Sequence, residues 1–121
     1  MSGGTPDLRL TWERCRGEWC LLAACNPPPH VAGVYVIWQP LLFIRGRQAV
    51  CVGRGDIRAC LAQRRGDERI AIHGGSSLLV TWAPCPADAR DGVVRFLAAA
   101  YQPHESEPDP HVAPVAVNLP L

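Results

Sequence analysis

Two cysteines, Cys51 and Cys60, stand on either side of a glycine-containing turn in AVCVGRGDIRACLAQRR, residues 49–65. The apolar run before the glycines and the arginine-rich run after them predict a short buried strand, a tight turn and a helix. Thiols placed on such a strand and helix can fill space in a core, bind a soft metal ion or act as a redox pair. What these two cysteines do depends on which other side chains the fold brings to them.

The same part of the chain carries most of the positive charge. All twelve cationic side chains are arginines. Residues 41–75 hold seven arginines against three acids, a net +4, whereas residues 76–121 hold two arginines against five acids, a net −3. The planar guanidinium suits phosphate, so these arginines are candidates for contacting DNA or RNA, the alternative being a solvated helix surface. The candidates are Arg54, Arg58, Arg64, Arg65 and Arg69.

Three further cysteines, Cys15, Cys20 and Cys25, are separated by four residues each in CRGEWCLLAAC. Zinc and iron–sulfur sites usually use closely spaced pairs that chelate from one loop, so we interpret these three as small buried residues. The chain does not start with a charged head followed by an apolar run, and no stretch approaches about 18 apolar residues. We therefore expect a soluble, cytoplasmic protein without membrane contacts, whose thiols are reduced.

The hydrophobic pattern predicts three strands and two helices. Asp56 is a good helix N-cap and Gly66 a good stop, so the first helix is expected at 57–65, and the second lies within 87–103. This order predicts an α+β fold, with a small three-stranded antiparallel sheet flanked by helices. The strands are expected at 33–38, 41–53 and 78–85, and the second leaves room for a turn at 45–47.

Proline-rich segments flank this core. The run NPPPH cannot continue a helix or a central strand, and four prolines interrupt the last eighteen residues. We expect an N-terminal extension with a Pro-rich connector at 1–31, a domain at 32–106 and an extended tail at 107–121. The apolar tail either covers its own domain or docks on a partner protein, and the sequence leaves both open.

Four stretches, AGVYVIW, VCVG, DIRACL and VVRFLAAAYQP, resemble the GIY-YIG nuclease superfamily in their order and approximate spacing. The resemblance covers roughly residues 32–106. It implies a GIY-YIG-like fold and a metal-assisted phosphodiester hydrolase that uses Mg²⁺ or Mn²⁺. In that family a tyrosine helps to activate water, a helix arginine neutralises the phosphate, and a glutamate holds the cation.

Three positions of this chain match that pattern and three depart from it. Tyr35 fits the first tyrosine, and Gly33 and Gly53 fit the motif glycines. His73, a second candidate catalytic residue beside Tyr35, lies about where some members place a polar residue after the helix; the alternative, which we favour, is a simple loop histidine. The second tyrosine, the helix arginine and the metal-binding glutamate are replaced, respectively, by Cys51, Cys60 and Val94.

These replacements favour nucleic-acid binding with cleavage weak or lost, because valine cannot ligate Mg²⁺ and a neutral thiol cannot replace a guanidinium. One alternative is an active endonuclease with a rearranged metal site at Glu105 or Glu107. Another is a non-catalytic pocket in which Cys51 and Cys60 bind zinc or an iron–sulfur cluster or act in redox, with His73 or Cys85 as further ligands. The last is a protein-interaction module that kept only the fold.

Overall fold

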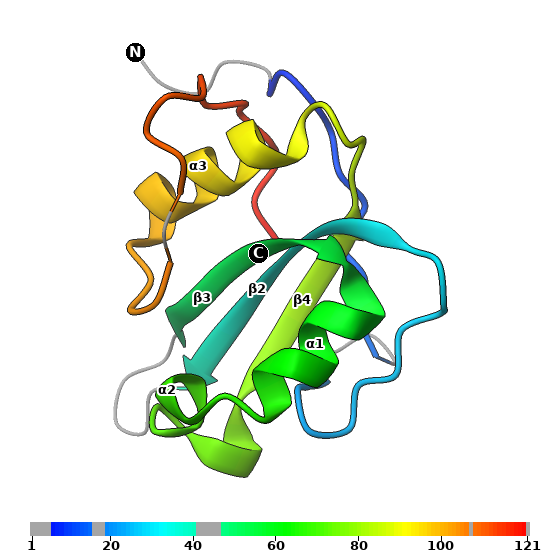
Figure 1. Cartoon of the computed structure of the whole chain (residues 1–121), viewed down its shortest axis with the longest axis vertical. Helices are drawn as coiled ribbons and strands as arrows, with labels where there is room; N and C mark the ends of the chain where they lie inside the picture. Colours follow the sequence, from blue (N-terminus) through cyan, green and yellow to red (C-terminus); the bar gives the residue numbers. More distant parts are fainter. Residues whose placement is uncertain (1–5, 16–18, 41–46, 107, 121) are drawn as a thin grey trace.

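A computed structural model describes residues 6–15, 19–40, 47–106 and 108–120. The chain has an α+β fold, as the sequence predicts (Figure 1). The expected turn at 45–47 lies largely outside the described residues. None of the described helices is long and apolar enough to cross a membrane. The elements are β1 (Cys20–Leu21), β2 (Ala32–Pro40), β3 (Arg47–Asp56), α1 (Ile57–Arg65), α2 (Glu68–Ala71), the 3₁₀ turn η1 (Gly75–Ser77), β4 (Leu79–Pro84) and α3 (Arg90–Tyr101).

The sheet is antiparallel and has four strands in the order β1-β4-β2-β3, so the expectation of three strands is corrected. The added strand, β1, comes from the N-terminal segment and pairs Cys20 with Val80 and Leu21 with Leu79. Two residues are too few to show a period-2 pattern, which is why the sequence does not reveal this strand. The N-terminal segment therefore adds an edge strand to the sheet.

Helices cover both faces of the sheet. On one face Tyr35 and Ile37 of β2 pack with Ile57 and Leu61 of α1. On the other face the alternate β2 residues pack against α3 (Figure 1). A register shift between Ile37 and Trp38 leaves Val50 as an extra residue on β3, and both Val50 and Cys51 are buried on the α1 face.

Helix α1 spans the predicted residues 57–65. Asp56 caps its start, where the Asp56 carboxylate accepts a hydrogen bond from the Ala59 N–H at 2.9 Å, and Gly66 ends it. Ile57 and Leu61 are fully buried. The rest of the helix surface, which carries its arginines, therefore faces away from the core.

The C-terminal tail covers its own domain. Val117 is buried and forms a bridge with Leu8, while Arg95 of α3 donates hydrogen bonds to two tail carbonyls. Gly92 allows the tail to approach α3, since a Cβ there would lie 2.5 Å from the Val115 side chain. The described tail residues thus cover their own domain, which is one of the two roles that the sequence left open.

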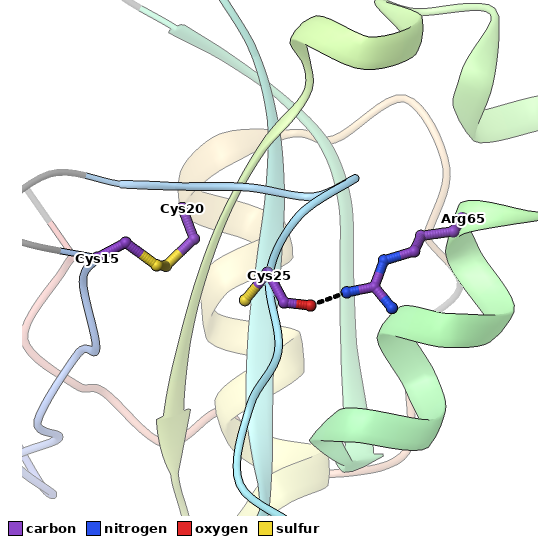
Figure 2. The surroundings of a disulfide bond; sticks show 4 residues. All are labelled: Cys15, Cys20, Cys25 and Arg65. Carbon is purple, nitrogen blue, oxygen red and sulfur yellow. Dashed lines mark hydrogen bonds between the residues drawn. A yellow bond between two sulfur atoms is a disulfide. The ribbon is translucent and has the colours of Figure 1, made fainter.

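Cys15 and Cys20 form a disulfide, in contrast to the expectation of reduced thiols (Figure 2). Four cysteines are free: Cys25, Cys51, Cys60 and Cys85. The disulfide pins the N-terminal segment to edge strand β1. The spacing alone could not show this, because a separation of five residues does not itself bring two sulfurs together.

Candidate functional site

A mostly polar pocket with a volume of about 370 Å³ opens beside edge strand β3. It gathers residues from β2, β3, α1, α2, α3 and the segment that follows α3. Three arginines and one glutamate line it, a net charge of +2 (three positive, one negative). The lining residues are Tyr35, Cys51, Val52, Gly53, Arg54, Cys60, Gln63, Arg64, Arg69, Val94, Glu105 and Ser106.

Tyr35 forms the floor of this pocket and is 1% exposed. Gly53 is its register partner on β3, and a Cβ at Gly53 would lie 2.2 Å from the Tyr35 hydroxyl oxygen. The tyrosine ring therefore rests on the bare glycine backbone. Gly33 has a comparable packing role, because a Cβ there would lie 1.9 Å from the Ala83 carbonyl oxygen on β4. Both motif glycines thus have a structural explanation in this chain.

Arg64 binds the Tyr35 hydroxyl. Its Nε donates to the hydroxyl oxygen at 3.0 Å, and its Nη1 donates to Asp67 Oδ2 at 3.2 Å. Burial by itself would lower the pKa of Arg64, but the interactions with Tyr35, Cys51 and Asp67 together outweigh burial, and the pKa is raised. The guanidinium is held in one place and stays charged.

The Tyr35 hydroxyl is a donor and not a base. Burial raises the pKa of Tyr35 to about 12, although the hydrogen bond from Arg64 opposes the rise. At neutral pH the hydroxyl keeps its proton while it accepts from Arg64. That proton can be donated to an anionic oxygen in the pocket.

Cys60 and Arg64 lie one helical turn apart on the same side of α1, and both line the pocket. The resemblance placed the family arginine at residue 60, where this chain has a thiol that donates to the Arg54 carbonyl oxygen at 3.4 Å. Burial raises the pKa of Cys60, so the thiol is neutral. Arg64, one turn further along α1, brings a guanidinium to the same pocket.

Cys51 is buried, and burial raises its pKa as well. Within the described part of the chain, neither Cys51 nor Cys60 belongs to a group of three ligand side chains close enough to hold a metal ion. Cys85 packs in the core on the other face of the sheet. His73 stacks on His104 at 4.4 Å between ring centroids and does not line the pocket. Neither His73 nor Cys85 therefore lies where it could serve as a third metal ligand beside Cys51 and Cys60.

Glu105 enters the pocket because the chain reverses after α3. Gln102 ends the helix in the left-handed conformation (φ 48°), and the following residues then run beside β3. The Glu105 N–H donates to the Val50 carbonyl oxygen at 2.8 Å. Ser106 Oγ accepts from the Val52 N–H at 2.8 Å. Val94 of α3 lines the same pocket, at the position where the resemblance would put a glutamate.

The five candidate arginines separate into distinct groups. Arg54, Arg64 and Arg69 line the pocket, and Arg54 also forms an ion pair with Asp91 of α3. Arg58 is exposed on α1 outside the pocket. Arg65 instead donates to backbone carbonyls of the N-terminal segment, at Leu22 (2.7 Å) and at Cys25.

Asp67 is the functional residue that the sequence reasoning missed. It caps α2 by accepting from the Arg69 N–H at 3.0 Å, and its carboxylate also receives the guanidinium groups of Arg64 and Arg69. The hydrogen bond from the Arg69 side chain is the main cause that lowers the pKa of Asp67. An Asp directly after the helix-ending Gly66 is an N-cap signal that could have located it.

Comparison of the chain with protein-family models, with curated proteins and with solved structures finds no match.

Proposed function

We propose that this chain is a GIY-YIG nuclease-like domain that binds nucleic acid at the β3-edge pocket, with phosphodiester cleavage weak or lost. The observation that carries the proposal is the contact between Arg64 and the buried Tyr35 hydroxyl. It prepares a fixed cation and a neutral hydroxyl donor at the floor of one polar pocket. A phosphate oxygen is the ligand that both groups would bind together.

The guanidinium of Arg64 can serve this role because its known contacts use only two of its five N–H donors. Asp67 holds Arg64 and Arg69 together on one side of the pocket. Arg54 adds a third positive charge from β3. We include these three arginines as phosphate contacts and leave out Arg58, which lies outside the pocket, and Arg65, which is engaged by carbonyls.

Weak cleavage follows from the same geometry. A tyrosine whose pKa is about 12 is ionised in roughly one molecule in 10⁵ at pH 7, so it cannot serve efficiently as a base for water. Val94 offers no oxygen to a metal ion at the pocket wall. The pocket thus keeps groups that hold a phosphate and lacks groups that drive its hydrolysis.

Fluorescence anisotropy with labelled single-stranded DNA, duplex DNA and RNA tests this proposal. We expect binding that weakens steeply with salt. Arg64→Gln should weaken it at least about tenfold, whereas Arg58→Gln, the same charge change on an exposed residue of the same helix, should change it less than about twofold. Urea titration of each variant checks that it is folded, and the exposed Arg69→Gln supplies a second pocket variant. No binding at low salt, or equal losses from Arg58→Gln and Arg64→Gln, would refute the proposal.

A second candidate function is metal-dependent cleavage through a rearranged site, and the specific observation in its favour is Glu105. Its carboxylate lines the same pocket as Tyr35 and Arg64. Mg²⁺ is often held by one or two carboxylates together with substrate phosphates. Glu105 is therefore the residue that would hold the ion.

A cleavage assay with Mg²⁺ and with Mn²⁺ separates the two functions. The binding proposal predicts little or no cleavage by the parent chain, and a gain in Val94→Glu, which adds an oxygen ligand to the pocket. Efficient cleavage by the parent that is abolished in Glu105→Gln would instead establish the second function.

A further inference from the structure

The sulfur atoms of Cys15, Cys20 and Cys25 lie within 4.8 Å of one another. They gather beside edge strand β1, at the end of the strand order opposite to the pocket. Figure 2 shows the Cys25 sulfur on the side of the Cys15–Cys20 disulfide and the Cys25 carbonyl on the side of Arg65. Among the described residues this is the one group of three metal-ligating side chains so closely placed.

Backbone contacts hold this cluster together. After Cys20 the chain turns tightly, with the Cys25 N–H donating to the Leu21 carbonyl oxygen at 2.8 Å. Arg65 of α1 donates to the Leu22 carbonyl and, as Figure 2 shows, to the Cys25 carbonyl across this turn. The third sulfur is therefore positioned by the fold and does not depend on the disulfide.

Two groups beside Cys25, the Trp82 indole and the Arg65 guanidinium, would stabilise a metal-bound thiolate against the cost of its burial. The Cys25 side chain is buried, with 6% exposed. Burial raises the pKa of Cys25, whereas the Trp82 indole N–H and the charge of Arg65 oppose the rise. The buried Trp82 Nε1 has no partner of good hydrogen-bond geometry in the described structure, so it is an unused donor next to this sulfur. At metal–thiolate sites, N–H donors and cations just outside the ligands commonly stabilise the negative charge of the sulfur.

We propose that reduction of the Cys15–Cys20 disulfide turns this cluster into a three-thiolate site for a soft metal ion such as Zn²⁺ or Cu⁺. Two molecules of a small thiol reduce the disulfide to two protein thiols and leave as one oxidised disulfide. One metal ion then replaces the protons of the three thiols, which are released to water. The exposed Cys15 gives the reductant and the ion access from solvent.

The distances among the three sulfur atoms suit a metal ion bound by thiolates. Zn–S bonds of about 2.3 Å in a tetrahedral site place sulfurs roughly 3.8 Å apart, so the cluster needs only small side-chain movements. Three thiolates around Zn²⁺ carry a net charge of −1, which the Arg65 guanidinium lies close enough to balance. The fourth position of a zinc ion would stay open to water or to another ligand.

Titration of the fully reduced chain with Cd²⁺ under anaerobic conditions tests the proposal. We expect one equivalent to bind with thiolate-to-metal charge-transfer absorption, and Cd²⁺ to displace Zn²⁺ from the same site. Cys25→Ser should weaken binding at least about tenfold, whereas the matched variant Cys85→Ser, another buried free cysteine, should leave it unchanged. Equal binding by Cys25→Ser and the parent would overturn the proposal.

Alkylation mapping of the unmodified chain gives an answer that does not depend on how the variants fold. In the reduced protein, Cd²⁺ should protect Cys15, Cys20 and Cys25 from alkylation. Protection confined to other cysteines would overturn the proposal, as would a Cys15–Cys20 disulfide that survives thiol reductant in the native protein.

Discussion

The two edges of the sheet make different use of two consecutive arginines. At the β3 edge, Arg64 directs its guanidinium to the Tyr35 hydroxyl and keeps donors for a ligand. On the other side of α1, Arg65 donates to the carbonyls of Leu22 and Cys25 and so fastens the cysteine-bearing segment. Successive helix residues point about 100° apart, so neighbours in sequence serve different surfaces. The role of each arginine in such a run can therefore be assigned only after the position of the helix on the sheet is known.

The largest effect is expected from a change at the glycine under Tyr35. Gly53→Ala puts a Cβ 2.2 Å from the hydroxyl oxygen, so the buried ring has to move. We expect a loss of about 1–3 kcal/mol in the free energy of unfolding, together with loss of nucleic-acid binding. Urea denaturation measures the first and anisotropy the second.

Gly66→Ala is the matched control, because its Cβ would meet no atom closer than 3.8 Å. We expect a change within about 0.5 kcal/mol. If the two alanine variants were equally stable, the close approach of Tyr35 to Gly53 would not exist in solution.

Exchanging each of the paired arginines for methionine separates their roles. Arg65→Met should lower stability by about 1–2 kcal/mol, because two carbonyls lose a charged donor, and should leave nucleic-acid affinity within about twofold. Arg64→Met should reduce the affinity at least about tenfold. Thermal unfolding and anisotropy of both variants make the comparison, and it fails if Arg65→Met weakens binding as much as Arg64→Met does.

A further effect on stability is confined to alkaline pH, where Tyr35 ionises. The folded-state pKa of Tyr35, about 12, is above the unfolded value near 10, so its contribution is complete below about pH 10 and is lost as the pH rises toward 12. At most about 2–3 kcal/mol is at stake. The chain has two tyrosines, and the pKa of Tyr101 is also raised to about 12. Tyrosinate absorbance of the Tyr101→Phe variant isolates Tyr35, and a midpoint near pH 10 would contradict the buried hydroxyl.

Local signals in the sequence determine much of this fold. Asp56 and Gly66 mark both ends of α1, and the run of strand-forming residues GVYVIW predicts the strand at β2. The two-residue strand β1 carries no such signal, since it forms only by pairing with β4. The local sequence pattern therefore predicts the central strands and α1 but misses edge strand β1, which depends on pairing between distant segments.

The candidate site is harder to predict for a related reason. Motif spacing directs attention to Cys60, yet helical periodicity already places Arg64 one turn further along the same side. Glu105 reaches the pocket only through the reversal at Gln102 and the pairing beside β3. Cys25 lies beside the disulfide because of a turn after Cys20 that the sequence does not indicate. Each of these residues depends on contacts between segments that are distant in sequence.

The most direct test of the account is an NMR titration that observes the Nε–H signals of Arg64 and Arg65 while a short oligonucleotide is added. We predict that the Arg64 signal shifts in a saturable, salt-dependent manner and that the Arg65 signal, which reports the carbonyl contacts, stays in place. A shift of the Arg65 signal alone, or no shift of either signal at saturating oligonucleotide, would contradict the assignment of the β3-edge pocket as the nucleic-acid site.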